Sequence, residues 1–205
     1  MSGDHYFSAQ PGSEFRTKTI RVPIAGREVE LGTAPGVFSP DRLDTGTAVL
    51  LAAVPPPPPS GHLLDLGCGW GPIALTLAIE SPLATVWAVD VNERSLELTR
   101  QNAARLGISN VNAVPPADVP AGLEFAAIWS NPPIRIGKAE LHGLLSAWLP
   151  RLRPGSDAWL VVQKNLGADS LQRWLEAELG DSHSLFREET AKGYRVLRAR
   201  RRGHG

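Results

Sequence analysis

A glycine-rich turn between a short strand-like run and a helix is the feature that most constrains this chain. The turn spans Asp65 to Pro72, and within it Gly67, Gly69 and Gly71 stand at alternate positions. Glycine permits the positive φ angles of such a turn and lets a ligand approach the backbone, while proline suits a first helical position. The run His62 to Leu64 just before it suits a buried parallel strand. The stretch therefore predicts a strand, a ligand-binding turn and a helix in direct succession.

An aspartate follows the next predicted strand. Ala84 to Val89 reads as a buried strand and ends at Asp90, roughly 20 residues beyond the glycines, where dinucleotide-binding proteins place the acid that accepts hydrogen bonds from a ribose. This unit is therefore expected to bind a nucleoside. Pro72 stands where the G-x-G-x-x-G spacing needs its last glycine, which argues against a nicotinamide cofactor.

Strands and helices alternate from Gly61 onward. A helix is expected to begin after Asn92 as its cap and to stop at Gly107. Further strands are expected at 111–114, 125–129 and 158–162, further helices near 141–150 and 170–180, and an antiparallel edge pair at 184–186 and 194–197. This pattern predicts the α/β class, with a Rossmann-like, doubly wound, mostly parallel seven-stranded sheet and helices on both faces.

The first 60 residues are expected to form an N-terminal extension packed on a catalytic domain at 61–205. Two strand-like runs, 18–22 and 28–31, flank Ala25-Gly26 and predict a hairpin. A helix is expected from Leu43 to Val54, with Asp44 or Thr45 at its start. The run Pro55 to Pro59 ends that helix and makes a stiff, extended spacer.

The composition excludes several classes of protein. Lysine and arginine together number 21, as do aspartate and glutamate, so the 205-residue chain carries no net charge and no general attraction for nucleic acid. Cys68 is the sole cysteine, which rules out an internal disulfide. The sequence lacks an apolar run of membrane-spanning length, a signal peptide and histidines at metal-ligand spacing. We expect a cytoplasmic protein with no membrane association and no metal.

Two prolines directly follow the predicted strand 125–129, in the sequence Ser130-Asn131-Pro132-Pro133. Prolines cannot donate the hydrogen bonds of a sheet, so by themselves they would only end a strand. Beside a nucleoside site they would hold the Asn131 side chain and a nearby carbonyl rigidly as two acceptors. Such a pair can orient an exocyclic amine toward an electrophilic methyl group, so that geometry and electrostatics carry the acceleration without a strong base.

Six stretches together resemble class I S-adenosylmethionine-dependent methyltransferases, and more closely the small-domain family that includes ribosomal RNA guanine-N2 methyltransferases. They are His5-Tyr6-Phe7-Ser8, Gly36-Val37-Phe38-Ser39, Leu43-Asp44-Thr45-Gly46-Thr47, Asp65 to Gly71, Val89-Asp90-Val91-Asn92 and Ser130-Asn131-Pro132-Pro133. The resemblance covers most of the chain, and its N-terminal motifs make it more specific than the glycine turn does.

The resemblance implies a cofactor, S-adenosyl-L-methionine, and a role for each matching residue. Asp65, Gly67 and Gly69 would line its methionine end, Asp90 would hold the ribose hydroxyls, and Asp118 would lie by the adenine amine. Val91 and Asn131 would border the cofactor as well. Asn131 and Pro132 would be catalytic and grip the base, while Pro133, Arg135 and Phe38 would contact the substrate.

One departure from the family affects substrate binding. Related enzymes often carry an aromatic residue after the two prolines, where it stacks on the target base, but this chain has Ile134 followed by Arg135. Stacking is then expected from Phe38 or Trp70.

The resemblance implies an S-adenosylmethionine-dependent N-methyltransferase, acting on N2 of a guanine in ribosomal RNA or a ribosomal subunit. Two alternatives stay open: an adenine-N6 or protein glutamine-amide methyltransferase, and a non-catalytic cofactor- or RNA-binding module. An arginine cluster at 195–202 is expected to be either a solvated tail or, together with Arg135, a clamp for RNA phosphates.

Overall fold

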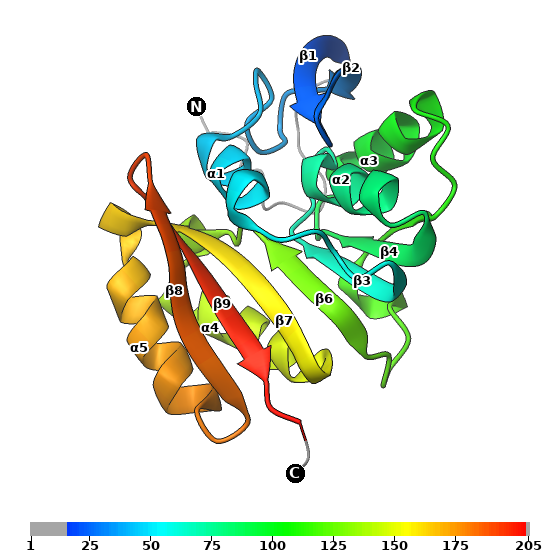
Figure 1. Ribbon diagram of the computed structural model, residues 1–205. Helices are drawn as coiled ribbons and strands as arrows, with labels where there is room; N and C mark the ends of the chain where they lie inside the picture. The colour runs from blue at the N-terminus through cyan, green and yellow to red at the C-terminus, as the bar shows by residue number, and fades with distance from the viewer. Residues whose placement is uncertain (1–15, 204–205) are drawn as a thin grey trace.

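The computed structural model describes residues 16–203, and a seven-stranded sheet runs through it (Figure 1). The strands are β3 (Ser60–Leu66), β4 (Leu83–Val89), β5 (Val111–Val114), β6 (Phe125–Ser130), β7 (Leu152–Gln163), β8 (His183–Ala191) and β9 (Tyr194–Arg201), in the spatial order β5-β4-β3-β6-β7-β9-β8. The first five in that order run parallel, and β9 pairs antiparallel with β7 and β8. The predicted fold class and its antiparallel edge pair are confirmed.

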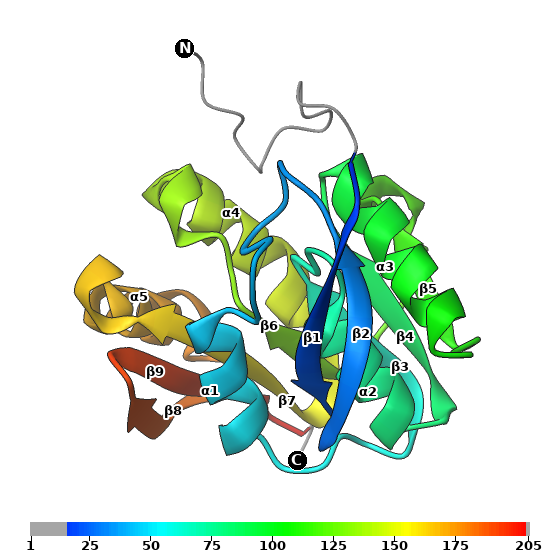
Figure 2. The same ribbon diagram turned by 90° about the horizontal axis from the view of Figure 1, so that it is seen from above.

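Helices cover both faces of this sheet (Figure 2). The helices are α1 (Thr45–Ala53), α2 (Pro72–Glu80), α3 (Glu93–Arg105), α4 (Lys138–Trp148) and α5 (Ala168–Leu179), with short 3-10 turns η1 (Pro116–Asp118), η2 (Ile134–Ile136), η3 (Leu149–Arg151) and η4 (Lys164–Leu166). Alternate strand residues serve the two cores: Leu160 packs with residues of α4 and α5, and Val161 with residues of α1, α2 and α3. The period of two places one apolar row on each face of the sheet.

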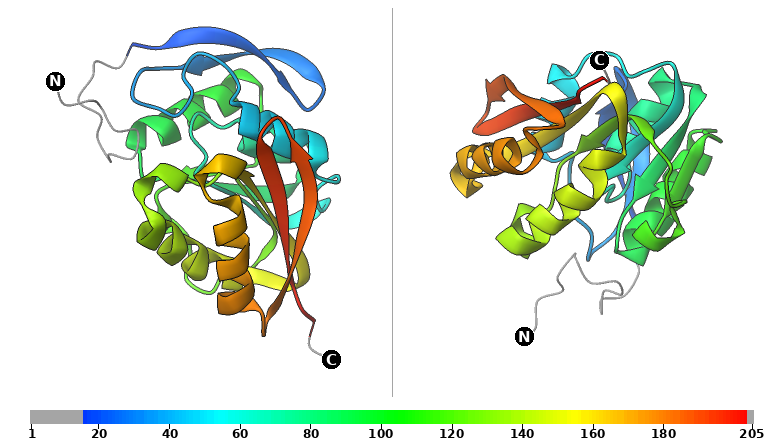
Figure 3. Two further views of the ribbon diagram at one scale, coloured as in Figure 1. Left: turned by 90° about the vertical axis from the view of Figure 1, so that its left-hand side faces the viewer. Right: turned by 90° about the horizontal axis from the view of Figure 1, so that it is seen from below.

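The predicted N-terminal hairpin consists of β1 (Lys18–Ile24) and β2 (Arg27–Thr33), and it lies across the outside of α2 and α3 (Figure 3). The buried Asn102 of α3 links it to the glycine turn. Its amide accepts from the Gly32 N–H at 2.6 Å and donates to the carbonyls of Gly32 and Trp70 at 2.9 Å each. The hairpin is thereby attached to the same loop that borders the site.

Helix α1 packs directly on the sheet beside β7 and β9. Asp44 is its N-cap, since the carboxylate accepts the Thr47 N–H at 3.0 Å. At the other end of α1 the proline run continues in an extended conformation and leads into β3. Of the two expected start positions, the structure selects Asp44 as the cap.

The arginine cluster at the C-terminal end is not a solvated tail, and that expectation is wrong. Four of its five arginines belong to β9, and their guanidinium groups pair with carboxylates of neighbouring elements, while Arg202 follows the strand. The pairs are Arg195 with Asp169, Arg198 with Glu188 and Asp157, Arg200 with Asp157, and Arg201 with Glu124. The run lies in an inner strand, between β7 and β8, where the neighbouring Val196 and Leu197 are buried in the two opposite cores of the sheet.

Within residues 16–203, no helix has the length and apolar character needed to cross a membrane. Over the same residues, no cluster of three or more His, Cys, Asp or Glu side chains is arranged to hold a metal ion.

Candidate functional site

The site lies where the chain changes direction along the sheet. From β3 the chain runs outward through β4 to β5, and it then returns to place β6 on the other side of β3. Ligands of doubly wound sheets bind at this crevice, beyond the carboxyl ends of the two central strands. The strand ends are tied together, because the Ser130 hydroxyl donates to the Leu66 carbonyl at 2.6 Å. The glycine turn after β3 and the Asn-Pro-Pro segment after β6 therefore face each other.

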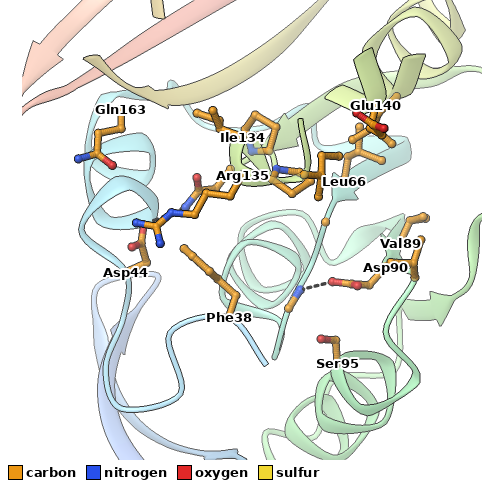
Figure 4. Close-up of a pocket in the computed structure, with 18 of the residues that line it drawn as sticks. Phe38, Asp44, Leu66, Val89, Asp90, Ser95, Ile134, Arg135, Glu140 and Gln163 are labelled. Carbon is orange, nitrogen blue, oxygen red and sulfur yellow. Dashed lines mark hydrogen bonds between the residues drawn. The ribbon is translucent and has the colours of Figure 1, made fainter. Parts of the chain in front are cut away.

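A cavity of about 480 Å³ opens between these two segments (Figure 4). In Figure 4, Asp90 and Ser95 lie on one side, while Asp44, Arg135 and Gln163 lie on the other. Its wall is largely apolar, and it includes three of the five large hydrophobic side chains that the described chain leaves exposed, namely Phe38, Val91 and Leu166. An apolar cleft with a few polar groups is the usual form of a site for a small organic ligand.

The glycine turn supplies the floor of this cavity. Gly67, Gly69 and Gly71 have φ angles of +81°, +56° and +99°, which only glycine adopts without strain. A Cβ on Gly71 would also lie 3.0 Å from the Thr99 hydroxyl oxygen. At Gly69 nothing lies within 4 Å of a Cβ position, so a ligand can approach the backbone closely there.

Asp90 is fixed at the edge of this turn by backbone amides. Its Oδ2 atom accepts the Gly69 N–H at 2.9 Å, and Oδ1 accepts the Asn92 N–H at 2.9 Å. Burial raises the pKa of the Asp90 carboxyl, and these N–H donors oppose the rise. The carboxylate is thus held rigidly with lone pairs left to accept from hydroxyl groups of a ligand.

Asp65 lies behind the glycine turn rather than at the cavity. It is fully buried, and its Oδ2 atom accepts the Ala74 N–H at 2.9 Å in the first turn of α2. Its other oxygen has no hydrogen-bond partner within the described part of the chain. Burial raises the pKa of Asp65 well above its ordinary value. Its position is that of a residue that shapes the turn from below.

Asn131 follows β6 and borders the cavity with its side chain. The Nδ2 atom donates to Asp44 Oδ2 at 2.8 Å and to Thr47 Oγ1 at 3.0 Å, both at the N-terminus of α1. Pro132 is buried behind it, and the Pro132 carbonyl already accepts the Ile134 N–H at 2.9 Å. The predicted pair of acceptors is therefore present, although one of them also holds η2.

The structure gathers most of the predicted site residues at this cavity. Those at its wall are Phe38, Gly67, Gly69, Asp90, Val91, Asn131, Pro132, Pro133 and Arg135. Asp118 is not brought there: it is exposed at the end of η1, and Pro116 of the same turn borders the cavity instead. The motif 5–8 lies outside the described residues.

Trp70 cannot stack on a base in this cavity, so that expectation is corrected. Its side chain is only 2% exposed and packs against the hairpin core, and its indole N–H donates to the Ser39 carbonyl at 3.2 Å. Of the two expected aromatic residues, Phe38 alone borders the large cavity.

Several polar residues of the wall were not expected there from the sequence. Besides Asp44, they are Ser95, Glu140, Gln163 and Tyr194. The Tyr194 ring packs so closely on α1 that a Cβ at Gly46 would lie 2.7 Å from one of its carbons. Asp44 could have been suspected, because it belongs to a family motif. Tyr194 starts the inner strand β9 and carries no local signal.

Comparisons with known proteins agree with this geometry. The profile of the methyltransferase small domain matches residues 28–198. YbxB of Bacillus subtilis, an uncharacterized protein, is 34% identical over 201 residues, which is 97% of this chain and 98% of that protein. Ribosomal RNA small subunit methyltransferase C of Pseudomonas aeruginosa (strain LESB58) is 32% identical over 197 residues, which is 94% of this chain but 57% of the relative.

A solved structure extends the comparison to a bound cofactor. The T. thermophilus 16S rRNA N2-guanine methyltransferase RsmC, in complex with AdoMet and guanosine, superposes with a TM-score of 0.77 at 25% identity. The match covers 93% of this chain and 52% of that one, so the chain spans about half the length of these ribosomal RNA methyltransferases.

Fold and comparisons together define an S-adenosylmethionine-dependent methyltransferase with a fold of the RsmC type. The chain belongs to the methyltransferase small domain family, and its cofactor is S-adenosyl-L-methionine.

Proposed function

We propose that this chain methylates N2 of a guanine in ribosomal RNA. The observation that carries the proposal is the position of Asn131: its amide borders the same cavity as the glycine turn and Asp90. Relatives named for ribosomal RNA methylation align with nearly the whole chain at 32% identity, which supports RNA as the substrate class.

The residues of the cavity fit S-adenosylmethionine. The open space at the Gly69 Cβ position admits a ligand against the backbone, and the amide-held carboxylate of Asp90 suits two ribose hydroxyls. Gly67, Gly69, Asp90 and Val91 would hold the cofactor, and Asp65 would act from behind the turn. When bound, S-adenosylmethionine supplies a methyl group activated by its sulfonium sulfur.

The opposite wall would hold the acceptor base. Asn131 Oδ1 and the Pro132 carbonyl accept the two N–H bonds of an exocyclic amine, which fixes the nitrogen and aims its lone pair. Phe38 is 37% exposed at this wall and would pack on the base in place of the aromatic residue that Ile134 replaces. A guanine in a stem would have to leave its stack to reach this position.

Two arginines at the rim would contact RNA phosphates. Arg135 borders the cavity. Burial raises the pKa of the Tyr194 phenol and the Asp44 carboxylate adds to the rise, while the positive charges of Arg135 and Arg42 oppose it. Both are exposed, and neither forms an ion pair with any residue between 16 and 203. Because four of the C-terminal arginines pair with carboxylates of this chain, Arg135 and Arg42 are better placed than that cluster to contact an RNA backbone.

The test is nucleoside analysis of ribosomal RNA by mass spectrometry in cells with and without this protein. N2-methylguanosine should be lost without it and restored by the wild type, but not by Asn131→Ala. Asn112→Ala, an exposed asparagine on β5, is the matched control and should restore the modification. A lost N6-methyladenosine would replace guanine with adenine as the target. An unchanged RNA profile would overturn the proposal and direct attention to a protein amide or to a binding module.

A further inference from the structure

The amide of Asn131 is held by groups from a distant part of the chain. Asp44 and Thr47, which receive its two hydrogen bonds, precede it by 87 and 84 positions. Asp44 is itself immobilised, since Oδ2 also accepts the Thr47 N–H at 3.0 Å at the start of α1. Asn131 therefore faces a fixed, negatively charged partner across the cavity wall.

This partner decides which way the amide points. The oxygen and nitrogen of an asparagine side chain are nearly isosteric, so an amide between neutral neighbours can be turned over. An ionised carboxylate only accepts hydrogen bonds, which requires Nδ2 on the Asp44 side. Both N–H bonds of Nδ2 are then used, and Oδ1 is left facing away from α1 without a partner in the described chain.

The charge of Asp44 also acts through the amide. A carboxylate that accepts an N–H bond pushes electron density onto the amide that donates it, and hydrogen-bonded chains polarise one another in a low-dielectric wall. Oδ1 thereby becomes a stronger acceptor for an N–H bond of the amine, whose nitrogen gains positive charge during methylation.

We propose that Asp44, assisted by Thr47, is a positioning residue that fixes Asn131 Oδ1 as the acceptor for the amine and strengthens it electrostatically. This inference rests on the proposed function, because it assumes that an amine is the group methylated. A helix cap alone would not need this arrangement: serine or asparagine would cap α1 equally well, and neither Asn131 nor a negative charge is needed for capping.

The experiment compares Asp44→Asn, Asp44→Ser and Thr47→Val with the wild type, by methyl transfer to RNA that lacks the modification. Both replacements of Asp44 retain a cap for α1, so the folding of the variants is preserved. We expect kcat to fall about ten- to a hundredfold, while the affinity for S-adenosylmethionine, measured by calorimetry, stays within about twofold. Thr47→Ser keeps the hydroxyl and should therefore retain the wild-type kcat, in contrast to Thr47→Val. Asp41→Asn removes the same charge three residues upstream, where the carboxylate is exposed and pairs with Lys18, and should leave kcat unchanged.

A second readout does not depend on turnover. In the ¹⁵N-labelled protein, the side-chain amide protons of Asn131, assigned with Asn131→Ala, should exchange slowly in the wild type and faster in Asp44→Asn. Wild-type kcat in both Asp44→Asn and Thr47→Val would overturn the inference, as would a loss of cofactor affinity that matches the loss of kcat. If the wild type transfers no methyl group to RNA, the proposed function fails, and the amide exchange of Asn131 alone tests the positioning role of Asp44. Equal exchange rates in the wild type and Asp44→Asn would overturn that role. Faster exchange in the variant would support it.

Discussion

Replacing Asn102 tests whether the hairpin and the glycine turn form one structural unit. The Asn102 side chain is fully buried on α3 and makes three hydrogen bonds, to the N–H and carbonyl of Gly32 and to the carbonyl of Trp70. Asn102→Ala removes all three and leaves their backbone partners unpaired away from water. Each neutral hydrogen bond contributes about 1 kcal/mol net, and each stranded buried group costs about 1–3 kcal/mol.

We therefore expect Asn102→Ala to lower the free energy of unfolding by about 4 kcal/mol. This is less than the sum of the largest costs of the three stranded groups, because the surrounding structure relaxes and relieves part of that cost. For a chain of this size that corresponds to a fall in Tm of about 10 °C. Equilibrium urea denaturation and a thermal scan measure the two quantities. Because Trp70 lies between two glycines of the turn, the affinity for S-adenosylmethionine should fall as well.

Two further variants sharpen the result. Asn102→Asp keeps the shape and the acceptor for Gly32 N–H, but at neutral pH it places an unpaired buried charge against two carbonyls, so it should destabilise more than alanine does. Gln101→Ala on the same helix removes only an exposed bond to Glu97 and should change stability by less than about 0.5 kcal/mol. A loss below about 1 kcal/mol in Asn102→Ala, or equal losses for alanine and aspartate, would refute the reasoning.

Three other outcomes follow from the site. Gly71→Ala, with a φ of +99° and a crowded Cβ position, should cost about 1–3 kcal/mol in urea denaturation, whereas the helical, open Gly143→Ala should stabilise by up to about 1 kcal/mol; equal effects would contradict this account. Burial raises the pKa of Asp65 in the folded state, so its contribution to stability falls as pH rises from below about 4 through that pKa. The Tm of Asp65→Asn relative to the wild type should therefore increase as the pH is raised above about 4, and a constant difference would argue against it. Arg135→Ala should weaken RNA binding and reduce the slope of log affinity against log salt by about 0.7, while the hairpin control Arg21→Ala should leave the slope unchanged.

The fold could be predicted from local patterns because the signals that specify it are local. A glycine turn after one strand and an aspartate after the next define the nucleoside half of the site within a short stretch, and the structure joins Gly69 to Asp90 directly. Asn92 as a cap and the two-residue period of the strands are likewise readable without tertiary information.

What could not be predicted depends on contacts between distant segments. Asp44 is recognisable as a helix cap, but nothing nearby in sequence indicates that its carboxylate also holds Asn131. Trp70 looks available in a loop, yet the hairpin covers it. The arginine run resembles a tail, because the carboxylates that neutralise it come from four other elements or loops. Asp118 has the right residue type, but η1 turns its side chain to solvent.

The two halves of the cavity differ in how far apart in the chain their contacts lie. The cofactor side is closed by the bond between Gly69 and Asp90, only 21 positions apart, whereas the acceptor side depends on Asp44 and Asn131, 87 positions apart. Contacts over longer loops cost more entropy to form, and they form later in folding. The cofactor side should therefore persist in partly unfolded states in which the acceptor side is already open. Binding of the cofactor and binding of the acceptor substrate are then separable properties of one small domain.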